Sequence, residues 1–442
     1  MDETERLRGV IKDCVHCGFC LPACPTYQLW AEEMDSPRGR IYLVNQILEG
    51  AELTPAAAVH FDRCLGCMAC MTACPSGVQY DQLIEVARVW TEEARSEPAP
   101  AVAGVPAAAG RLARARDRAA RAAIFSLFPY PRRLRAVTGP LRAAQRTGLD
   151  RRLARSSLPG RLSPTLGAAL KLAPPPSVAV RLPERVAARG QRRAVVGMLT
   201  GCVQSVFFPR VNAATARVLA TEGCDVIIPR GQGCCGALSL HSGREAEAVA
   251  FARRTIETFE RAGVDAIVVN SAGCGSAMKE YERLLGRDGQ DLGWAGRAAA
   301  LSARVRDLSE FLTELGPAAP RHPLPVTAAY HDACHLAHAQ RITRQPRELL
   351  RAIPELRLVE LADAGTCCGS AGVYNLLQPE AAGELGARKA QAVLDAGAPL
   401  LISANPGCTL QIAAALADRG EHVAVAHTAE ILDASLRGRS WS

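Results

Sequence analysis

Eight of the seventeen cysteines stand in two runs with the same spacing, and each run is followed by proline. The runs are Cys14-Val-His-Cys17-Gly-Phe-Cys20-Leu-Pro-Ala-Cys24-Pro25 and Cys64-Leu-Gly-Cys67-Met-Ala-Cys70-Met-Thr-Ala-Cys74-Pro75. In the C-x2-C-x2-C-x3-C-P pattern three cysteines wrap one [4Fe–4S] cubane, and the fourth reaches the other cluster of the pair. The spacing therefore predicts two clusters, one on Cys14, Cys17, Cys20 and Cys74 and one on Cys64, Cys67, Cys70 and Cys24.

Zinc is the alternative occupant, because four thiolates also suit that ion. Zinc motifs usually come as two separated C-x2-C pairs, whereas each run here holds four cysteines, so clusters are favoured. We interpret His16 as a residue at the surface or beside the ligands. Gly18, Gly66 and Gly77 are expected to serve turn geometry.

A second set of cysteines occurs in an internal repeat. Each copy has one cysteine, then a Cys-Cys-Gly, then one more cysteine, with matching intervals. The members are Cys202, Cys234, Cys235 and Cys274 in the first copy and Cys334, Cys367, Cys368 and Cys408 in the second. Three hypotheses stay open: further iron–sulfur clusters, a redox-active thiol pair, or a site that has lost its function. A disulfide between adjacent cysteines is strained, which favours metal ligation.

Four other residues near these cysteines have plainer interpretations. Cys224 has no counterpart in the second copy, so we predict a buried apolar residue. His241, His331 and His335 are expected to be hydrogen-bonded structural histidines, with contact to a cofactor or substrate as the alternative.

The elements that position these cysteines can be predicted from the pattern. Ser36 can cap a helix that starts at Pro37, and a second helix is expected over 80–94. In each repeat an apolar strand precedes each cysteine group, and helices alternate with the strands. This alternation indicates a mainly parallel sheet with its cysteines at the strand carboxyl ends, where open α/β sheets place their sites.

The predicted fold class is multidomain α+β: a helical two-cluster ferredoxin domain followed by two repeated α/β Cys-Cys-Gly lobes. The expected ranges are 1–97 for the ferredoxin domain, 98–190 for a basic helical linker, and 191–320 and 321–442 for the two lobes. No catalytic residue is assigned to the chain.

The net charge of +8 is unevenly spread. Residues 101–175 hold fifteen Arg or Lys and two acidic residues. We expect this segment to dock on an acidic partner or an anionic membrane face, with a solvated surface as the alternative. Its apolar patch at 124–130 suits the same contacts. Nucleic acid is not expected as a partner, because no binding motif accompanies the charge.

The chain has no run of 18 apolar residues and no signal-peptide pattern at its start. A cytoplasmic location is therefore expected, with peripheral contact to the inner face of the cytoplasmic membrane left open. In that compartment disulfides are disfavoured, so the cysteine content favours metal or redox chemistry.

The amino-acid sequences of three segments resemble those of the iron–sulfur subunits of bacterial glycolate oxidase. These segments are 14–27, 36–43 (Ser-Pro-Arg-Gly-Arg-Ile-Tyr-Leu) and 64–80, and the resemblance covers nearly the whole chain. It implies two [4Fe–4S] clusters and no flavin on this chain. It further implies a separate flavin-binding catalytic subunit that oxidises glycolate to glyoxylate, and a further flavoprotein-like subunit. Electrons would pass through this chain toward the respiratory quinone pool, and the chain would be inactive alone.

One departure bears on the repeats. The Cys-Cys-Gly domains of heterodisulfide reductase end in C-x2-C, whereas Ala277 and Gln411 stand at the last position here. A five-cysteine cluster is therefore in doubt. Two alternative functions stay open: the iron–sulfur subunit of an anaerobic glycerol-3-phosphate or lactate dehydrogenase, and a thiol/disulfide or quinone reductase using the Cys-Cys-Gly site.

Overall fold

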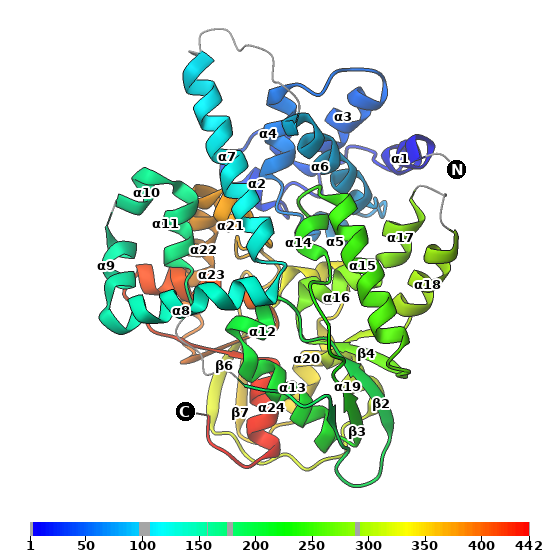
Figure 1. The fold of residues 1–442 in the computed structure, drawn as a ribbon, viewed down its shortest axis with the longest axis vertical. Helices are drawn as coiled ribbons and strands as arrows, with labels where there is room; N and C mark the ends of the chain where they lie inside the picture. Colours follow the sequence, from blue (N-terminus) through cyan, green and yellow to red (C-terminus); the bar gives the residue numbers. More distant parts are fainter. Residues whose placement is uncertain (1–2, 97–106, 157, 175–179, 288–291, 442) are drawn as a thin grey trace.

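The N-terminal part of the molecule is helical (Figure 1). The first cysteine run lies in the loop between two helices, and the second lies partly in loops and partly in a short helix, which holds Cys70. The structure, a computed structural model, describes residues 3–441 except 97–106, 157, 175–179 and 288–291. The predicted cap is present, since Ser36 Oγ accepts a hydrogen bond from Gly39 N at 3.0 Å and Pro37 opens the helix. The elements are α1 (Glu3–Lys12), α2 (Pro25–Trp30), the 3₁₀ turn η1 (Glu33–Asp35), α3 (Pro37–Leu48), α4 (Pro55–Arg63), α5 (Ala69–Ala73) and α6 (Tyr80–Ser96).

The first lobe is a five-stranded sheet in the order β1-β3-β2-β4-β5, parallel except for the short edge strand β1. Its strands are β1 (Arg185–Val186), β2 (Ala194–Met198), β3 (Cys224–Ile227), β4 (Ala266–Val269) and β5 (Val305–Asp307). Its helices are α12 (Val203–Phe207), α13 (Pro209–Thr221), α14 (Ala237–Leu240), α15 (Glu245–Glu260), α16 (Ala272–Lys279), α17 (Tyr281–Gly286), α18 (Leu292–Ser302) and α19 (Leu308–Leu315).

The second lobe is a four-stranded, fully parallel sheet in the order β7-β6-β8-β9. Its strands are β6 (Val326–His331), β7 (Leu356–Glu360), β8 (Leu400–Ser403) and β9 (Ala424–His427). Its helical elements are the π-helical turn η2 (His335–Ala339), α20 (Arg344–Arg351), α21 (Tyr374–Leu377), α22 (Pro379–Asp395), α23 (Pro406–Asp418) and α24 (Thr428–Leu436). The prediction of two repeated parallel-sheet lobes is confirmed.

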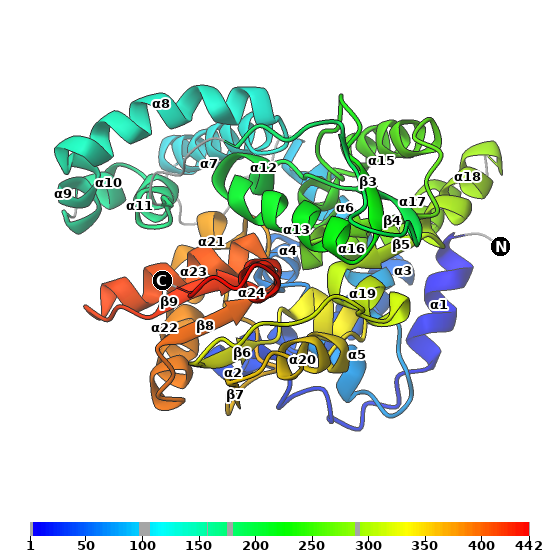
Figure 2. The ribbon, with the colours of Figure 1, turned by 90° about the horizontal axis from the view of Figure 1, so that it is seen from below.

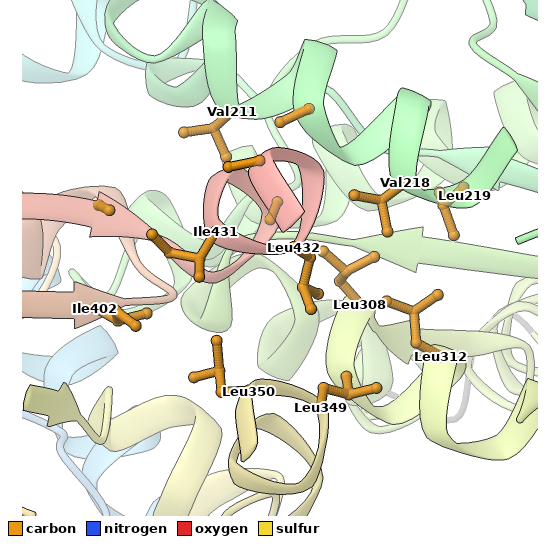
Figure 3. Packing of buried hydrophobic residues seen from close by; sticks show 14 of the residues in the cluster. Val211, Val218, Leu219, Leu308, Leu312, Leu349, Leu350, Ile402, Ile431 and Leu432 are labelled. Atoms are coloured by element: carbon orange, nitrogen blue, oxygen red, sulfur yellow. The ribbon is translucent and has the colours of Figure 1, made fainter. Parts of the chain in front are cut away.

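The two lobes share one hydrophobic core (Figure 3). Val211 and Val218 of α13 pack with Ile431 and Leu432 of α24, and α19 of the first lobe packs in turn on α20 of the second. The last helix of each lobe therefore packs on the other lobe, which holds the two sheets in a fixed relation.

In its described part the linker forms five helices, which lie along one side of the lobes (Figures 1 and 2). They are α7 (Ala107–Leu127), α8 (Pro131–Thr147), α9 (Leu149–Arg155), α10 (Leu158–Leu162) and α11 (Pro164–Lys171). α12 packs against α8, and α21 and α22 pack against α11. No helix in the described part of the chain combines the length and apolar composition needed to cross a bilayer.

The apolar patch at 124–130 is not available for the contact with a partner or membrane that we expected. Ile124 and Phe125 are buried against Val373 and Leu376 of the second lobe, and Phe128 packs beside them. The expectation of an external contact through this patch was wrong, because the end of α7 and the apolar side of α21 cover each other.

The ferredoxin-like part is held against both lobes. A Cβ at Gly243 would lie 2.1 Å from Arg88 O, so the backbone of the turn before α15 packs directly on the backbone of α6. On the other lobe, Thr72 Oγ1 lies 2.8 Å from His338 Nδ1. Ion pairs join α6 to α17, among them Arg283 Nη1 to Asp81 Oδ2 at 2.7 Å. The clusters' predicted ligands are thereby brought close to the Cys-Cys-Gly cysteines.

Candidate iron–sulfur sites

The structure brings each predicted ferredoxin ligand set together around its own hollow. One hollow, site 1, is lined by Cys14, Cys17, Cys20 and Cys74. The other, site 2, is lined by Cys24, Cys64, Cys67 and Cys70. Pro37, Cys70 and Tyr80 line both hollows, so the two sites are neighbours. Each site takes three thiols from one run and the fourth from the other, as the motif predicts.

The two runs follow the same backbone path. The second residue after each first cysteine and the residue after each second cysteine have left-handed φ: 53° at His16 and 87° at Gly18, then 63° at Gly66 and 62° at Met68. These turns let three thiols of one run converge on one hollow. His16 itself is exposed, in agreement with the surface interpretation.

One arginine holds the backbone of each cysteine run by a hydrogen bond. Arg38 Nη1 donates to His16 O at 3.2 Å, and Arg88 Nη2 donates to Cys64 O at 2.6 Å. A Cβ at Gly66 would lie 2.9 Å from Arg88 Nη1, so glycine is needed both for φ and for this close approach. The two arginines come from α3 and α6, helices outside the runs.

A buried charge network stands beside site 2. The carboxylate of Asp35 accepts from Arg40 Nη2 at 3.3 Å, His60 Nδ1 at 2.9 Å and Arg63 Nη1 at 2.7 Å. Arg40 also donates to Thr26 Oγ1 at 3.1 Å and lines the site 2 hollow. Three donors fix one carboxylate, which holds a positive guanidinium at the thiols.

This charge has a visible effect on the thiols. Burial raises the pKa of Cys67 and of Cys70 well above the usual value. Burial also acts on Cys64, but the positive charges of Arg40 and Arg88 outweigh it and lower the pKa of that thiol. The hydroxyl of Tyr80 donates to Cys64 Sγ at 3.6 Å and acts in the same sense. The two arginines thus favour anionic sulfur, the form in which cysteine binds iron, at Cys64.

The donor sets fit [4Fe–4S] clusters. Each hollow is lined by its four predicted thiols, none of them in a disulfide, and compensating cations stand at the more buried hollow. A bound cluster supplies one-electron oxidation and reduction. The sequence reasoning missed Asp35, Arg40 and Arg88. The only signal was polar residues at helical positions next to the runs, and their burial is a result of tertiary packing.

The Cys-Cys-Gly cysteines lie just after strands, as predicted. In the first lobe Cys202 Sγ and Cys234 Sγ are 3.6 Å apart. In the second lobe donor atoms of His331, Cys368 and Cys408 all lie within 4.8 Å of one another. Cys224 is instead in the core shared by the lobes, where burial raises its pKa to about 11. The prediction for Cys224 is therefore confirmed.

All eight Cys-Cys-Gly cysteines reach one cavity of about 350 Å³ between the lobes, which we call the shared cavity. Apolar side chains of both lobes and of the linker helices α8 and α11 form much of its other walls, among them Val137, Leu141 and Leu166. His241 and His335 also line it, with their ring centroids 4.9 Å apart. Nothing in the sequence signalled that the two copies face each other.

Site 2 adjoins the second lobe. Leu65 and Cys67 pack in one buried cluster with Cys334, Cys367 and Tyr374. Burial, followed by the charge of Cys334, raises the pKa of Cys67, which reflects how near these thiols are. Sites 1 and 2, the second-lobe cysteines and the shared cavity therefore form an unbroken row.

Comparison with known families agrees with this layout. Residues 10–78 match the 4Fe-4S dicluster domain, and residues 196–279 and 328–413 each match the cysteine-rich domain. Residues 116–173 match the linker region of the glycolate oxidase iron-sulfur subunit.

Whole proteins are similar as well. The probable glycolate oxidase iron-sulfur subunit of Bacillus subtilis (strain 168) is 35% identical over 98% of this chain and 94% of its own length. The glycolate oxidase iron-sulfur subunit of Escherichia coli (strain K12) is 35% identical over 97% and 95%. Lactate utilization protein A of an Exiguobacterium strain is 32% identical over 55% of this chain and 98% of its own. With a dicluster domain, the family's linker and two cysteine-rich domains in one chain, this iron–sulfur protein belongs to the family of glycolate oxidase iron–sulfur subunits.

Proposed function

We propose that this chain is the electron-transfer subunit of a glycolate oxidase and carries electrons from a flavin subunit toward the quinone pool. The observation that carries the proposal is the row of cysteine sites from the surface at site 1 to the shared cavity. The eight ferredoxin cysteines are the proposed ligands of two [4Fe–4S] clusters. Glycolate oxidation to glyoxylate takes place on the partner, and this chain has no such activity alone.

Electrons enter at site 1. Cys17 is exposed, and Val15 and Phe19 beside it are two of the most exposed large apolar side chains in the described part of the chain, at 68% and 65%. Apolar side chains in solvent next to a redox site suit a partner surface. The flavin subunit is therefore proposed to cover this loop. A further flavoprotein-like subunit completes the complex.

Electrons leave at the shared cavity. Its apolar walls suit a lipophilic acceptor such as a quinone, and Val137 and Leu166 are both cavity-lining and exposed. Leu149, Leu158 and Leu162 are also exposed on the neighbouring helices of the linker. With exposed arginines between them, these helices suit peripheral contact with an anionic membrane.

Reduction by substrate tests the proposal. The purified, cluster-loaded complex should lose its visible cluster absorbance on addition of glycolate under anaerobic conditions, whereas the chain alone should not. Phe19→Glu should weaken assembly with the flavin subunit and slow this reduction, while Val59→Glu, an exposed apolar position on α4, serves as the matched control. Reduction by lactate or glycerol 3-phosphate in place of glycolate would select the alternative dehydrogenases. Glycolate reduction of the chain alone would count against a separate catalytic subunit.

A further inference from the structure

The two cysteine-rich lobes differ at one position that reaches the cysteines. Three residues before Cys334 the second lobe has His331, the last residue of β6. Three residues before Cys202 the first lobe has Leu199. Leu199 is buried in an apolar cluster with Cys235 and Ala277, so the first lobe has no polar donor there.

His331 is placed and buried as a ligand would be. Its side chain is 1% exposed, and its donor atom lies within 4.8 Å of those of Cys368 and Cys408. Neither ring nitrogen makes a hydrogen bond of normal geometry with a described residue, and the polar group that the ring faces is the thiol of Cys368. Burying an imidazole costs free energy when its nitrogens have no hydrogen-bond partners. The state of both His331 nitrogens, in a site lined by thiols, therefore indicates that a bound group is missing.

Gln411, which stands where a fifth cysteine would be, is not available as a ligand for the missing group. Gln411 Nε2 donates to Ala382 O at 2.8 Å, and Gln411 Oε1 accepts from Asn375 Nδ2 at 3.0 Å. Both ends of this amide are occupied. His331 is therefore the additional donor beside the four cysteines of the second lobe.

We propose that the second lobe holds an iron–sulfur cluster with His331 as a ligand, together with thiolates from Cys334, Cys367, Cys368 and Cys408, and that the first lobe lacks this histidine-ligated centre. The inference rests on the chain being an iron–sulfur protein and not on glycolate as the substrate. A mixed histidine and cysteine set also suits zinc, which makes metal identity part of the test.

A histidine ligand has a functional consequence. Neutral imidazole replaces an anionic thiolate, and histidine ligation raises the reduction potential of Rieske centres over all-cysteine ones. The second-lobe centre adjoins site 2 through Cys67 and Cys334. A raised potential there favours electron flow away from the ferredoxin-like part and toward the shared cavity.

The test uses the full chain, purified anaerobically, with iron and sulfide counts and pulsed EPR after reduction. The wild type should show a strong ¹⁴N coupling. His331→Leu should lose that coupling and about four iron and four sulfide per chain, and should keep about eight of each at sites 1 and 2. His331→Cys should keep the iron, lose the nitrogen coupling and lower the reduction potential of one centre.

His335→Leu is the matched control, because His335 lies at the same cysteines but within hydrogen-bond distance of Cys334 Sγ, at 3.5 Å. It should keep both the iron and the coupling. Three outcomes would overturn the proposal: full iron and coupling in His331→Leu, loss of the coupling in His335→Leu instead, or zinc in the second lobe. None of them depends on whether glycolate reduces the complex, so the two proposals fail separately.

Discussion

Gly39 stands where no side chain fits. A Cβ there would lie 2.0 Å from Glu33 O and 2.9 Å from Met34 Cα, both backbone atoms. The close approach brings η1 against the start of α3, which sets Asp35 and Arg40 side by side behind site 2. The glycine therefore acts on the cluster site through the backbone, although it touches no cysteine.

Gly39→Ala should destabilise the ferredoxin-like part by about 3 kcal/mol, because the backbone of η1 must move. The measurement is the denaturant midpoint at which the cluster absorbance is lost. Gly383→Ala is the control: Gly383 lies inside α22 with no atom within 4 Å of the added Cβ. It should be neutral or stabilising by up to about 1 kcal/mol. Equal midpoints for Gly39→Ala and the wild type would contradict this account.

His427 links stability to pH. Its Nδ1 accepts from Ala429 N at 3.0 Å and its Nε2 donates to Asn270 O at 2.8 Å, which requires the neutral ring. Burial lowers its pKa to about 4. In the unfolded chain the pKa is about 6.5, so the unfolded state gains a proton first as the pH falls.

The sign follows from this difference. The stabilisation by neutral His427 is present above pH 6.5 and is lost as the pH falls toward 4. Between pH 7 and 5.5 the free energy of unfolding of the wild type should drop by about 1 kcal/mol more than that of His427→Asn. Denaturant unfolding at the two pH values measures this. Parallel pH dependences in both proteins would show that His427 is not the group responsible.

At the scale of elements, both lobes end in the same way, with a strand followed by a capped helix. The last strand of each lobe leads into a capped helix: Asp307 and Glu310 form the capping box of α19, and His427 and Glu430 form that of α24. Each of these helices then packs on a helix of the other lobe. Arg217 of α13 adds a double hydrogen bond to Asp433 of α24, at 2.9 and 2.6 Å. The repeat is thus tied together by reciprocal contacts.

Leu432→Ala tests whether the shared core stabilises the two lobes. Leu432 is fully buried in the core shared by the lobes (Figure 3). Its truncation should cost about 2–5 kcal/mol of unfolding free energy, since a cavity is left behind. Leu394→Ala, at a partly buried position on α22 packed against the second lobe's own core, should cost less. Thermal or urea unfolding of both variants measures the difference; the reverse order would argue against a common core.

At the scale of the whole molecule, the linker separates two environments. Its inner side closes the shared cavity and buries Ile124 and Phe125. Helices α8 to α11 lie next to one another on this side of the molecule (Figure 2). Leucines and arginines on these helices are exposed to solvent. Part of the basic charge that the sequence concentrates at 101–175 is therefore carried on α8 and α11, which also cover the proposed acceptor site.

Vesicle binding tests the outer side. Replacing Leu158 and Leu162 together by Asp should lower the affinity for vesicles with anionic lipid by at least about tenfold, because two apolar contacts are lost and two like charges are added. Val59→Asp, on α4 outside the linker, should leave the affinity unchanged. Iron content should be the same in all variants. Equal binding by wild type and the double variant would remove the linker from any membrane contact.

The sequence by itself determined the fold class, the family resemblance and the local elements at the sites. Cysteine spacing, the Ser36 cap and the strands before each Cys-Cys-Gly are local signals, because they depend on residues a few positions apart. The structure gathers the predicted ferredoxin sets around two hollows, and their role as ligands stays a prediction.

Only the tertiary structure decided how the parts face one another. That both copies open on one cavity, that Arg40 and Asp35 are buried beside site 2, and that Ile124 and Phe125 point inward all depend on contacts between segments far apart in the chain. A periodic pattern shows which side of a helix is apolar but not which distant surface covers it. For the same reason the sequence alone does not separate His331 from a structural histidine, and its position at Cys368 and Cys408 comes from the folding of segments after three separate strands toward one another.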